Sequence, residues 1–204
     1  MLEQLIPFLS ASILLTFAPG PDIIYVLVQS ITNGKKYGIF TALGLVSGII
    51  VHTTLVAFGI SALIAASASL FFIIKLFGAC YLFFLAYQIF KSDAKVAFSS
   101  EGVPHKSGKE LFKQGFVMNV LNPKVTIFFL AFFPGFLWEP EGNTVAQFYL
   151  LGFIFMVQAF LIFTLISLLA GKISTYLKKH PRSGLVLKWI QILVFIGIGV
   201  FILL

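Results

Sequence analysis

Two charged residues, Asp22 and Lys124, lie inside long apolar segments, and each follows a break in its segment. Asp22 closes residues 16–22 (TFAPGPD), and Lys124 closes residues 119–124 (NVLNPK). Because a proline lacks an amide hydrogen and clashes with the preceding turn, a helix that runs through either stretch must open. Each break therefore puts a charged side chain beside freed backbone groups.

These groups suit the two ends of a zwitterion. Freed carbonyls and the Asp22 carboxylate accept hydrogen bonds from an ammonium, while helix starts after the breaks favour a carboxylate. An amino acid fits this pattern, and so do other small polar solutes. We expect the substrate-binding residues to be Pro19, Gly20, Pro21, Asp22, Asn119, Asn122, Pro123 and Lys124.

Asp22 and Lys124 are expected at similar depths in a membrane. The helical rise places Asp22 about 9 Å and Lys124 about 14 Å from the same end of their segments. Charged groups in hydrocarbon are costly, so they need partners or water. We hypothesise that the two side chains face each other, directly or across a substrate, in a polar cavity. The alternative is that the first break is only a kink, in which Asp22 caps the second half-helix.

The elements that hold these residues are transmembrane helices. The 204 residues are 59% hydrophobic and only 10% charged, with a mean hydropathy of +1.04, far more apolar than a soluble domain. Runs of about 20 apolar residues span a bilayer core. We predict an all-α integral membrane protein with six spans, at Leu5–Val28, Tyr37–Leu63, Ser69–Phe90, Gly115–Phe136, Phe148–Leu169 and Val186–Leu204.

The basic residues indicate the orientation of the spans. Lysine and arginine are missing from the N-terminal residues, from residues 65–68 and from residues 138–145. By the positive-inside rule the basic loops are cytoplasmic and both termini lie outside. The net charge of +7 is thus mainly a topology signal, and we expect no nucleic-acid partner. The basic loops or their borders hold Lys35, Lys36, Lys91, Lys95, Lys106, Lys109, Lys113, Lys172, Lys178, Lys179, Arg182 and Lys188.

Three spans precede a polar stretch at residues 91–114 and three follow it, so the second triplet enters the membrane from the opposite side. We predict two inverted three-helix repeats, residues 1–90 and 115–204, joined by a flexible cytoplasmic linker at 91–114. The first helix of each repeat is broken. Paired interruptions of this kind point to a transporter site near the membrane midplane.

The other polar residues in the spans have simpler explanations. His52 could carry a coupling proton, but we favour an interhelical hydrogen bond for it and for Gln158. Lys75 can extend to the interface, and Lys188 is expected to anchor a helix end. Gly44 and Gly48 form a small-residue face. We favour packing within the subunit for this face, with a homodimer interface or a sliding surface as alternatives.

Redox and metal chemistry are not expected. Cys80 is the only cysteine, so the chain can form neither an internal disulfide nor a dithiol pair. His52, His105 and His180 have no ligand-type spacing. We therefore predict no metal, no cofactor and no enzymatic activity.

Several motifs together resemble the lysine and homoserine/threonine exporter (LysE-type) family. They are the two broken stretches, the glycines from Gly34 to Gly48, residues 75–82 (KLFGACYL) and residues 128–134 (FFLAFFP). Family members often have glutamine where Gly135 stands here, a departure that bears on substrate or packing. The resemblance marks as signature residues Pro19, Gly20, Pro21, Asp22, Asn122, Pro123 and Lys124.

The resemblance implies export of amino acids or close derivatives across the bacterial inner membrane, driven by proton antiport. Within that scheme we expect Asp22 to take up the coupled proton. Three other readings stay open from the residues alone: a membrane-embedded enzyme or thiol relay, a passive channel, and a structural subunit. The identity of the amino acid is left open, although the few acidic residues in the spans disfavour a dibasic substrate.

Overall fold

A computed structural model describes residues 2–60, 68–92, 106–140, 142–180 and 182–203, and all regular structure in these ranges is helical. Short π-helical turns cover Val56–Ile60 and Phe128–Phe132, and a 3₁₀ turn covers Phe133–Phe136. The α-helices are α1 (Leu2–Phe17), α2 (Pro21–Thr32), α3 (Lys35–Leu55), α5 (Ala68–Lys91), α6 (Gly108–Val120), α7 (Pro123–Ile127), α8 (Thr144–Lys179) and α9 (Ser183–Leu203).

Within the described ranges, four helices are long and apolar enough to cross a membrane, and two bent pairs raise the number to as many as six. The pairs are α1 with α2, bent by 56°, and α6 with the segment that starts at Pro123, bent by 49°. Both bends fall at the predicted proline breaks. The six-segment interpretation therefore fits the helical architecture when each bent pair counts as one span.

Two helices extend furthest beyond the predicted spans. A capping box starts α6 at Gly108 rather than Gly115: the Ser107 hydroxyl accepts from the Glu110 amide, and the Glu110 carboxylate accepts from the Ser107 amide. The last part of the expected linker is thus helical, while residues 93–105 lie outside the described residues, as does most of the expected loop at 65–68. Helix α8 continues to Lys179, ten residues past the predicted end.

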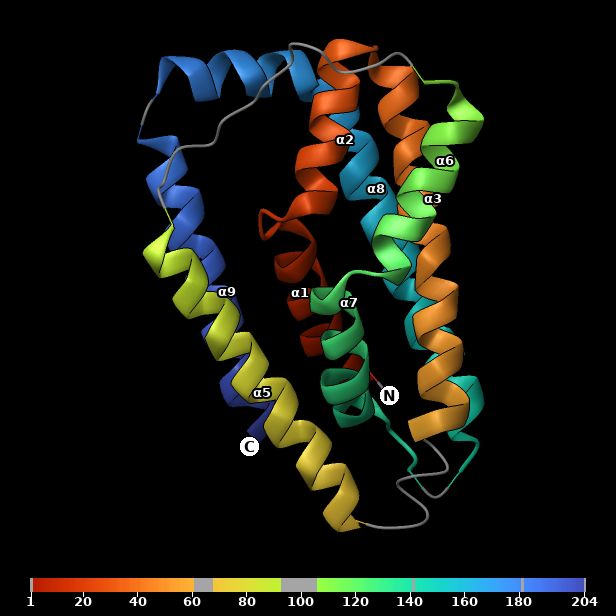
Figure 1. The fold of residues 1–204 in the computed structure, drawn as a ribbon. Helices are drawn as coiled ribbons and strands as arrows, with labels where there is room; N and C mark the ends of the chain where they lie inside the picture. Colours follow the sequence, from red (N-terminus) through yellow and green to blue (C-terminus); the bar gives the residue numbers. More distant parts are fainter. Residues whose placement is uncertain (1, 61–67, 93–105, 141, 181, 204) are drawn as a thin grey trace.

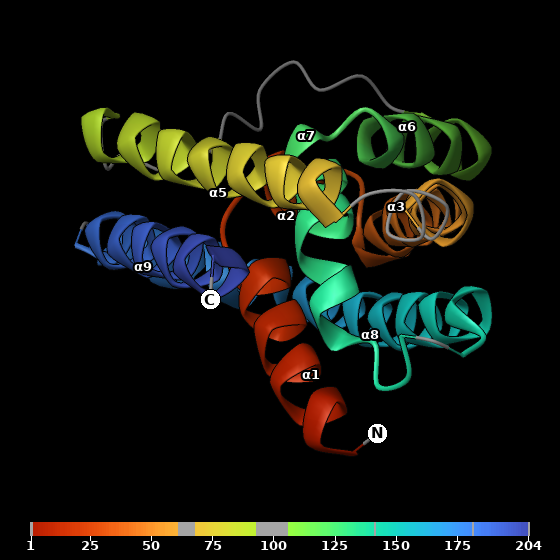
Figure 2. The same cartoon turned by 90° about the horizontal axis from the view of Figure 1, so that it is seen from below.

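The helices form two groups with the broken helices between them. Helix α3 packs against α6 and α8 in one group, and α5 packs against α9 in the other. Seen from below, α1 and α7 lie between the two groups (Figure 2). The end of α8 crosses the top of the molecule towards α9, and the chain ends lie towards the bottom (Figure 1). Both breaks are therefore held at the centre of the protein.

Glycines allow α3 to lie against α6. A Cβ on Gly44 would meet the backbone carbonyl of Phe112, and a Cβ on Gly48 would lie 2.6 Å from the side-chain oxygen of Asn119. From the opposite helix, a Cβ on Gly115 would lie 2.5 Å from the Thr41 carbonyl. The small-residue face thus packs inside this chain, which is the use we favoured from the sequence. A homodimer stays a prediction.

Gly44→Ala is expected to destabilise the protein because the new Cβ would push α6 away from α3. Overpacking of this kind costs about 1 to 3 kcal/mol, more than the helix propensity gained from alanine. Thermal unfolding of the purified protein in detergent measures the effect. The matched control is Gly197→Ala, where nothing lies within 4 Å of the new Cβ. Equal melting temperatures for the two variants would contradict the close packing of α3 and α6.

Phenylalanines support the segment that follows the second break. The Phe129 and Phe133 rings stack with centroids 3.9 Å apart, and Phe128 and Phe132 stack at 4.5 Å. Phe8 of α1 packs edge-on against Phe133 at 5.0 Å. All five side chains are buried. This cluster ties the irregular turns after α7 to α1, so the two broken helices are fixed to each other below the breaks.

Candidate functional site

The first break leaves the carbonyl of Leu15 without its helical partner. In a helix the donor to this carbonyl is the amide four residues later, but that residue is Pro19, which has no amide hydrogen. The Lys124 ammonium takes this role and donates to the Leu15 oxygen at 2.9 Å and to the Ala18 oxygen at 3.0 Å. A cation at the carboxyl end of α1 is also favoured by the helix dipole. A side chain from the second break thus supplies the hydrogen-bond donor that the first break lacks.

The second break resembles the first. The residue four positions after Asn119 is Pro123, so the usual helical donor to the Asn119 carbonyl is missing, and the amide of Asn122 donates to this oxygen instead at 2.9 Å. Nε2 of His52, from α3, lies 3.0 Å from this oxygen. Since a carbonyl can only accept, Nε2 carries the hydrogen. The interhelical hydrogen bond expected for His52 is present, and it stabilises the opened backbone of the second break.

Asn122 joins the two breaks directly. Its side-chain oxygen accepts from the Lys124 amide at 3.0 Å and so caps α7. Its Nδ2 donates to Oδ2 of Asp22 at 2.7 Å. Asp22 lies in the first turn of α2, where the helix dipole favours a carboxylate. The N-cap of α2 is Gly20, and no side chain among the described residues caps this helix by a hydrogen bond, so Asp22 interacts with the dipole of α2 but does not cap it in the way considered from the sequence.

Asp22 and Lys124 share one small cavity but do not form a direct ion pair. Both line a narrow space of about 30 Å³, enough for about one or two water molecules. Oδ1 of Asp22 and Oδ1 of Asn119 are buried and accept no hydrogen bond. Two unsatisfied acceptors and an ammonium therefore meet around a space that is too small for an amino acid.

Helices α1, α3 and α8 complete the wall of this cavity. Thr16 contributes from α1, and its hydroxyl accepts from Nε2 of Gln158 in α8 at 3.0 Å. Ile49 of α3 and Phe155 of α8 add apolar surface. Thr16 and Phe155 were not among the residues expected from the sequence. Gln158 forms the interhelical hydrogen bond that we favoured for it.

The eight expected site residues divide by position. Gly20, Asp22, Asn119 and Lys124 line the small cavity, and Asn122 reaches it through Asp22. The three prolines shape the backbone instead: Pro21 and Pro123 each begin a helix, and Pro19 faces a second, larger cavity.

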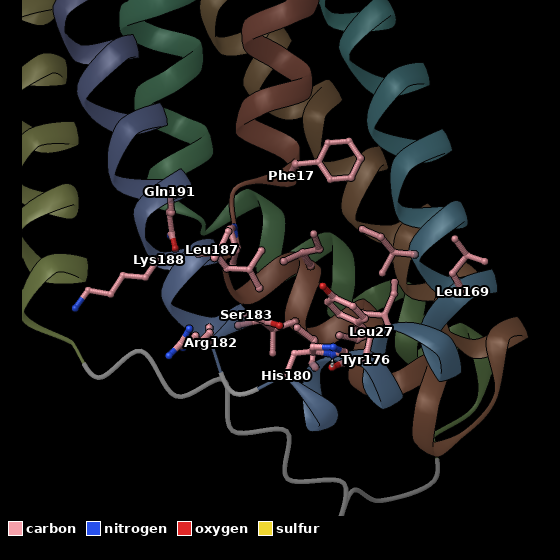
Figure 3. A pocket seen from close by; sticks show the side chains of 18 of the residues that line it. Phe17, Leu27, Leu169, Tyr176, His180, Arg182, Ser183, Leu187, Lys188 and Gln191 are labelled. Atoms are coloured by element: carbon pink, nitrogen blue, oxygen red, sulfur yellow. Dashed lines mark hydrogen bonds between the residues drawn. The ribbon is translucent and has the colours of Figure 1, made fainter.

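The larger cavity has a volume of about 1020 Å³ and lies among α2, α8, α9 and the end of α5. In Figure 3, Phe17 marks its inner end, next to the first break, while Tyr176, His180 and Arg182 lie near the opposite end. Ile23 lines both cavities. The first break therefore separates the two spaces.

Other candidate groups lie away from the two breaks. The Lys188 ammonium donates to the carbonyls of Phe90 and Ser92, both at 2.7 Å, which is the anchoring role expected for it. Cys80 is a free, exposed cysteine on α5. In the part of the chain that the structure describes, no three His, Cys, Asp or Glu residues are grouped as metal ligands.

An all-helical membrane protein with polar groups gathered between two broken spans has the architecture of a secondary transporter. Comparison with known families agrees with this class. The LysE type translocator family matches residues 13–204, and the chain belongs to this family. The protein is accordingly a transporter and not an enzyme, which removes the enzyme and thiol-relay readings.

Three proteins are similar to this chain in sequence. The homoserine/homoserine lactone efflux protein of Salmonella typhimurium is 30% identical over 171 residues, covering 84% of this chain and 82% of that protein. The uncharacterized membrane protein YrhP of Bacillus subtilis is 28% identical over 98% of both chains. An uncharacterized membrane protein of Vibrio cholerae is 34% identical over 71% of this chain and 70% of its own. No solved structure matches significantly.

Proposed function

We propose that this protein exports amino acids or close derivatives, with homoserine-like compounds as the first candidates, by alternating access around the two breaks. The family and the efflux activity in the name of the Salmonella relative support the substrate class and the direction. The observation that carries the proposal is the cavity shared by Asp22, Asn119 and Lys124, where buried acceptors and an ammonium converge.

The polar groups define how a zwitterion would bind. The substrate ammonium donates to the two free oxygens, Oδ1 of Asp22 and Oδ1 of Asn119. The substrate carboxylate lies against the Lys124 ammonium, which gives up a carbonyl contact to accept it. Because the cavity now holds only water-sized volumes, the helices around the breaks must move apart to admit the solute.

The repeat and the orientation belong to the same proposal. The two breaks occupy corresponding first spans, before and after the linker, which supports two inverted repeats that rock against each other. The turns rich in lysine and arginine lie at the end opposite the chain termini (Figure 1). We place that end in the cytoplasm of a bacterial cell, with the protein in the inner membrane and both termini outside.

Asp22 is the proposed proton carrier. In its charged form it holds the substrate ammonium, and a proton arriving from outside would neutralise the carboxylate and release the substrate. One proton then enters for each zwitterion that leaves. A single charge moving across the membrane potential supplies about 2.3 kcal/mol per 100 mV, enough for modest export against a gradient.

Counterflow in proteoliposomes tests this function. Vesicles that contain the purified protein and a high internal concentration of unlabelled L-homoserine are expected to accumulate external labelled homoserine transiently, because a carrier exchanges solute across one site. A pH gradient should drive net movement that a protonophore abolishes. Equilibration without transient accumulation would indicate a passive channel, and movement insensitive to the protonophore would contradict proton coupling.

A further inference from the structure

The larger cavity, which we call the vestibule, has mainly apolar walls. Its volume of about 1020 Å³ is far greater than that of the cavity between the breaks. Side chains from α2, α8, α9 and the end of α5 face it (Figure 3). The apolar walls include Ile24 and Leu27 of α2, Ile173 and Leu177 of α8, and Val186 and Leu187 of α9.

Among the residues that the structure describes, the charged groups of the vestibule all have the same sign. Lys172, Arg182 and Lys188 line it together with His180, and none of the described lining residues is an aspartate or glutamate. The ammonium of Lys188 is bound to the carbonyls at the end of α5. Among the described residues, the side chains of Lys172 and Arg182 have no hydrogen-bond or ion-pair partner. In the described part of the chain, the vestibule therefore combines apolar walls with positively charged side chains.

The vestibule reaches the first break. Pro19 faces the vestibule, whereas its neighbours Ala18 and Gly20 line the small cavity. Ile23, in the first turn of α2, lines both. The wall between the two spaces is thus formed by the opened backbone of the break and by one apolar side chain, so a modest movement of α2 would connect them.

We propose that the vestibule is the entry path to the small cavity and that it selects solutes with a free carboxylate and an apolar or neutral side chain over dibasic ones. This inference rests on the proposed export function. A positive potential in a low-dielectric cleft concentrates carboxylates and opposes a second ammonium. The apolar walls favour an apolar side chain by removing it from water. The single ammonium of a neutral amino acid then meets Asp22.

Thiol labelling tests the path without depending on transport. Cys80→Ser removes the only native cysteine, and Ile24→Cys then places one thiol in the vestibule. In reconstituted protein we compare two membrane-impermeant methanethiosulfonate reagents, one anionic and one cationic, each normalised to its rate with a free thiol. We expect the anionic reagent to react about tenfold faster or more. Lys172→Gln with Arg182→Gln should bring the ratio close to one.

Two outcomes would overturn the proposal. Equal reaction of the cationic reagent would show that the positive potential does not govern access. Failure of both charged reagents, with reaction only by a membrane-permeant maleimide, would show that lipid fills the space. Normal folding of the cysteine variant is checked by its melting temperature against the Cys80→Ser parent.

Counterflow then tests selection. Labelled leucine and homoserine should exchange at least tenfold faster than lysine, and Lys172→Gln with Arg182→Gln should reduce that preference. If the labelling behaves as expected but no amino acid exchanges, the proposed function fails while the water-filled basic vestibule stands. If neutral amino acids exchange but lysine exchanges equally well, the selectivity proposal fails while the export function stands.

Discussion

Asp22→Asn is expected to abolish export driven by a pH gradient. The amide keeps the size of the carboxylate and can still accept from Asn122, but it carries no charge and takes up no proton. Losing a charge-assisted contact to the substrate ammonium costs about 1.5 to 3 kcal/mol, which corresponds to about a ten- to hundredfold loss of affinity. Exchange at saturating substrate should survive in part, because it needs no net proton movement. Flux assays in proteoliposomes separate these two activities.

The control for this variant is Glu3→Gln, which removes an exposed carboxylate from the same bent span. It should leave both activities unchanged. Full proton-driven export by the Asp22→Asn protein would show that the coupling group lies elsewhere.

Lys124→Met is expected to reduce both stability and transport. The methionine fills similar space but leaves the carbonyls of Leu15 and Ala18 without a donor. Each buried, unsatisfied group costs about 1 to 3 kcal/mol, and the substrate carboxylate also loses its cation. The melting temperature and the counterflow rate measure the two effects. Lys75→Met, at another lysine in a span, is the matched control and should lower neither.

Exchanging the charges distinguishes this account from direct pairing. Asp22→Lys combined with Lys124→Asp should remain inactive, because a carboxylate at position 124 cannot donate to the carbonyls of α1. Rescue of transport above either single variant would contradict the role assigned to Lys124 and would indicate a direct ion pair with Asp22.

The sequence allowed both breaks to be predicted but not the groups that complete them. Pro19 and Pro123 each remove one amide, so two freed carbonyls followed from the sequence alone. The packing of α3 and α7 decides the other contacts. It brings the Lys124 ammonium to the carbonyls of the first break and His52 to the Asn119 carbonyl of the second. A single sequence contains no distance between residues about a hundred positions apart.

The start of α6 and the end of α8 were predicted wrongly for local reasons. The motif from Ser107 to Glu110 is a readable capping box, yet the surrounding lysines and glycines suggested a tether instead. Helix α8 continues after its apolar stretch because Ile173 and Leu177 still pack against the hydrophobic core, although Lys172 made this region look like a loop. The prediction placed the start of α6 and the end of α8 wrongly because it relied on where charged residues begin. A helix can continue past the hydrocarbon region into the polar region.

Gly20→Cys offers the most direct test that substrate binds between the two breaks. The new Cβ would lie 3.6 Å from the Lys124 ammonium nitrogen and 3.8 Å from the Ala18 oxygen, so the side chain fits. Gly20 lines the small cavity and has an extended backbone that any residue adopts.

In the Cys80→Ser background, a small methanethiosulfonate reagent should modify this thiol as the transporter opens, and saturating L-homoserine or L-leucine should slow the reaction about tenfold or more. A cysteine at exposed Lys109 should react at the same rate with and without the amino acid. We expect the amino acid to protect the thiol of Gly20→Cys and not the thiol at position 109. Undiminished labelling by a variant that still transports the amino acid would show that the substrate does not bind between the breaks.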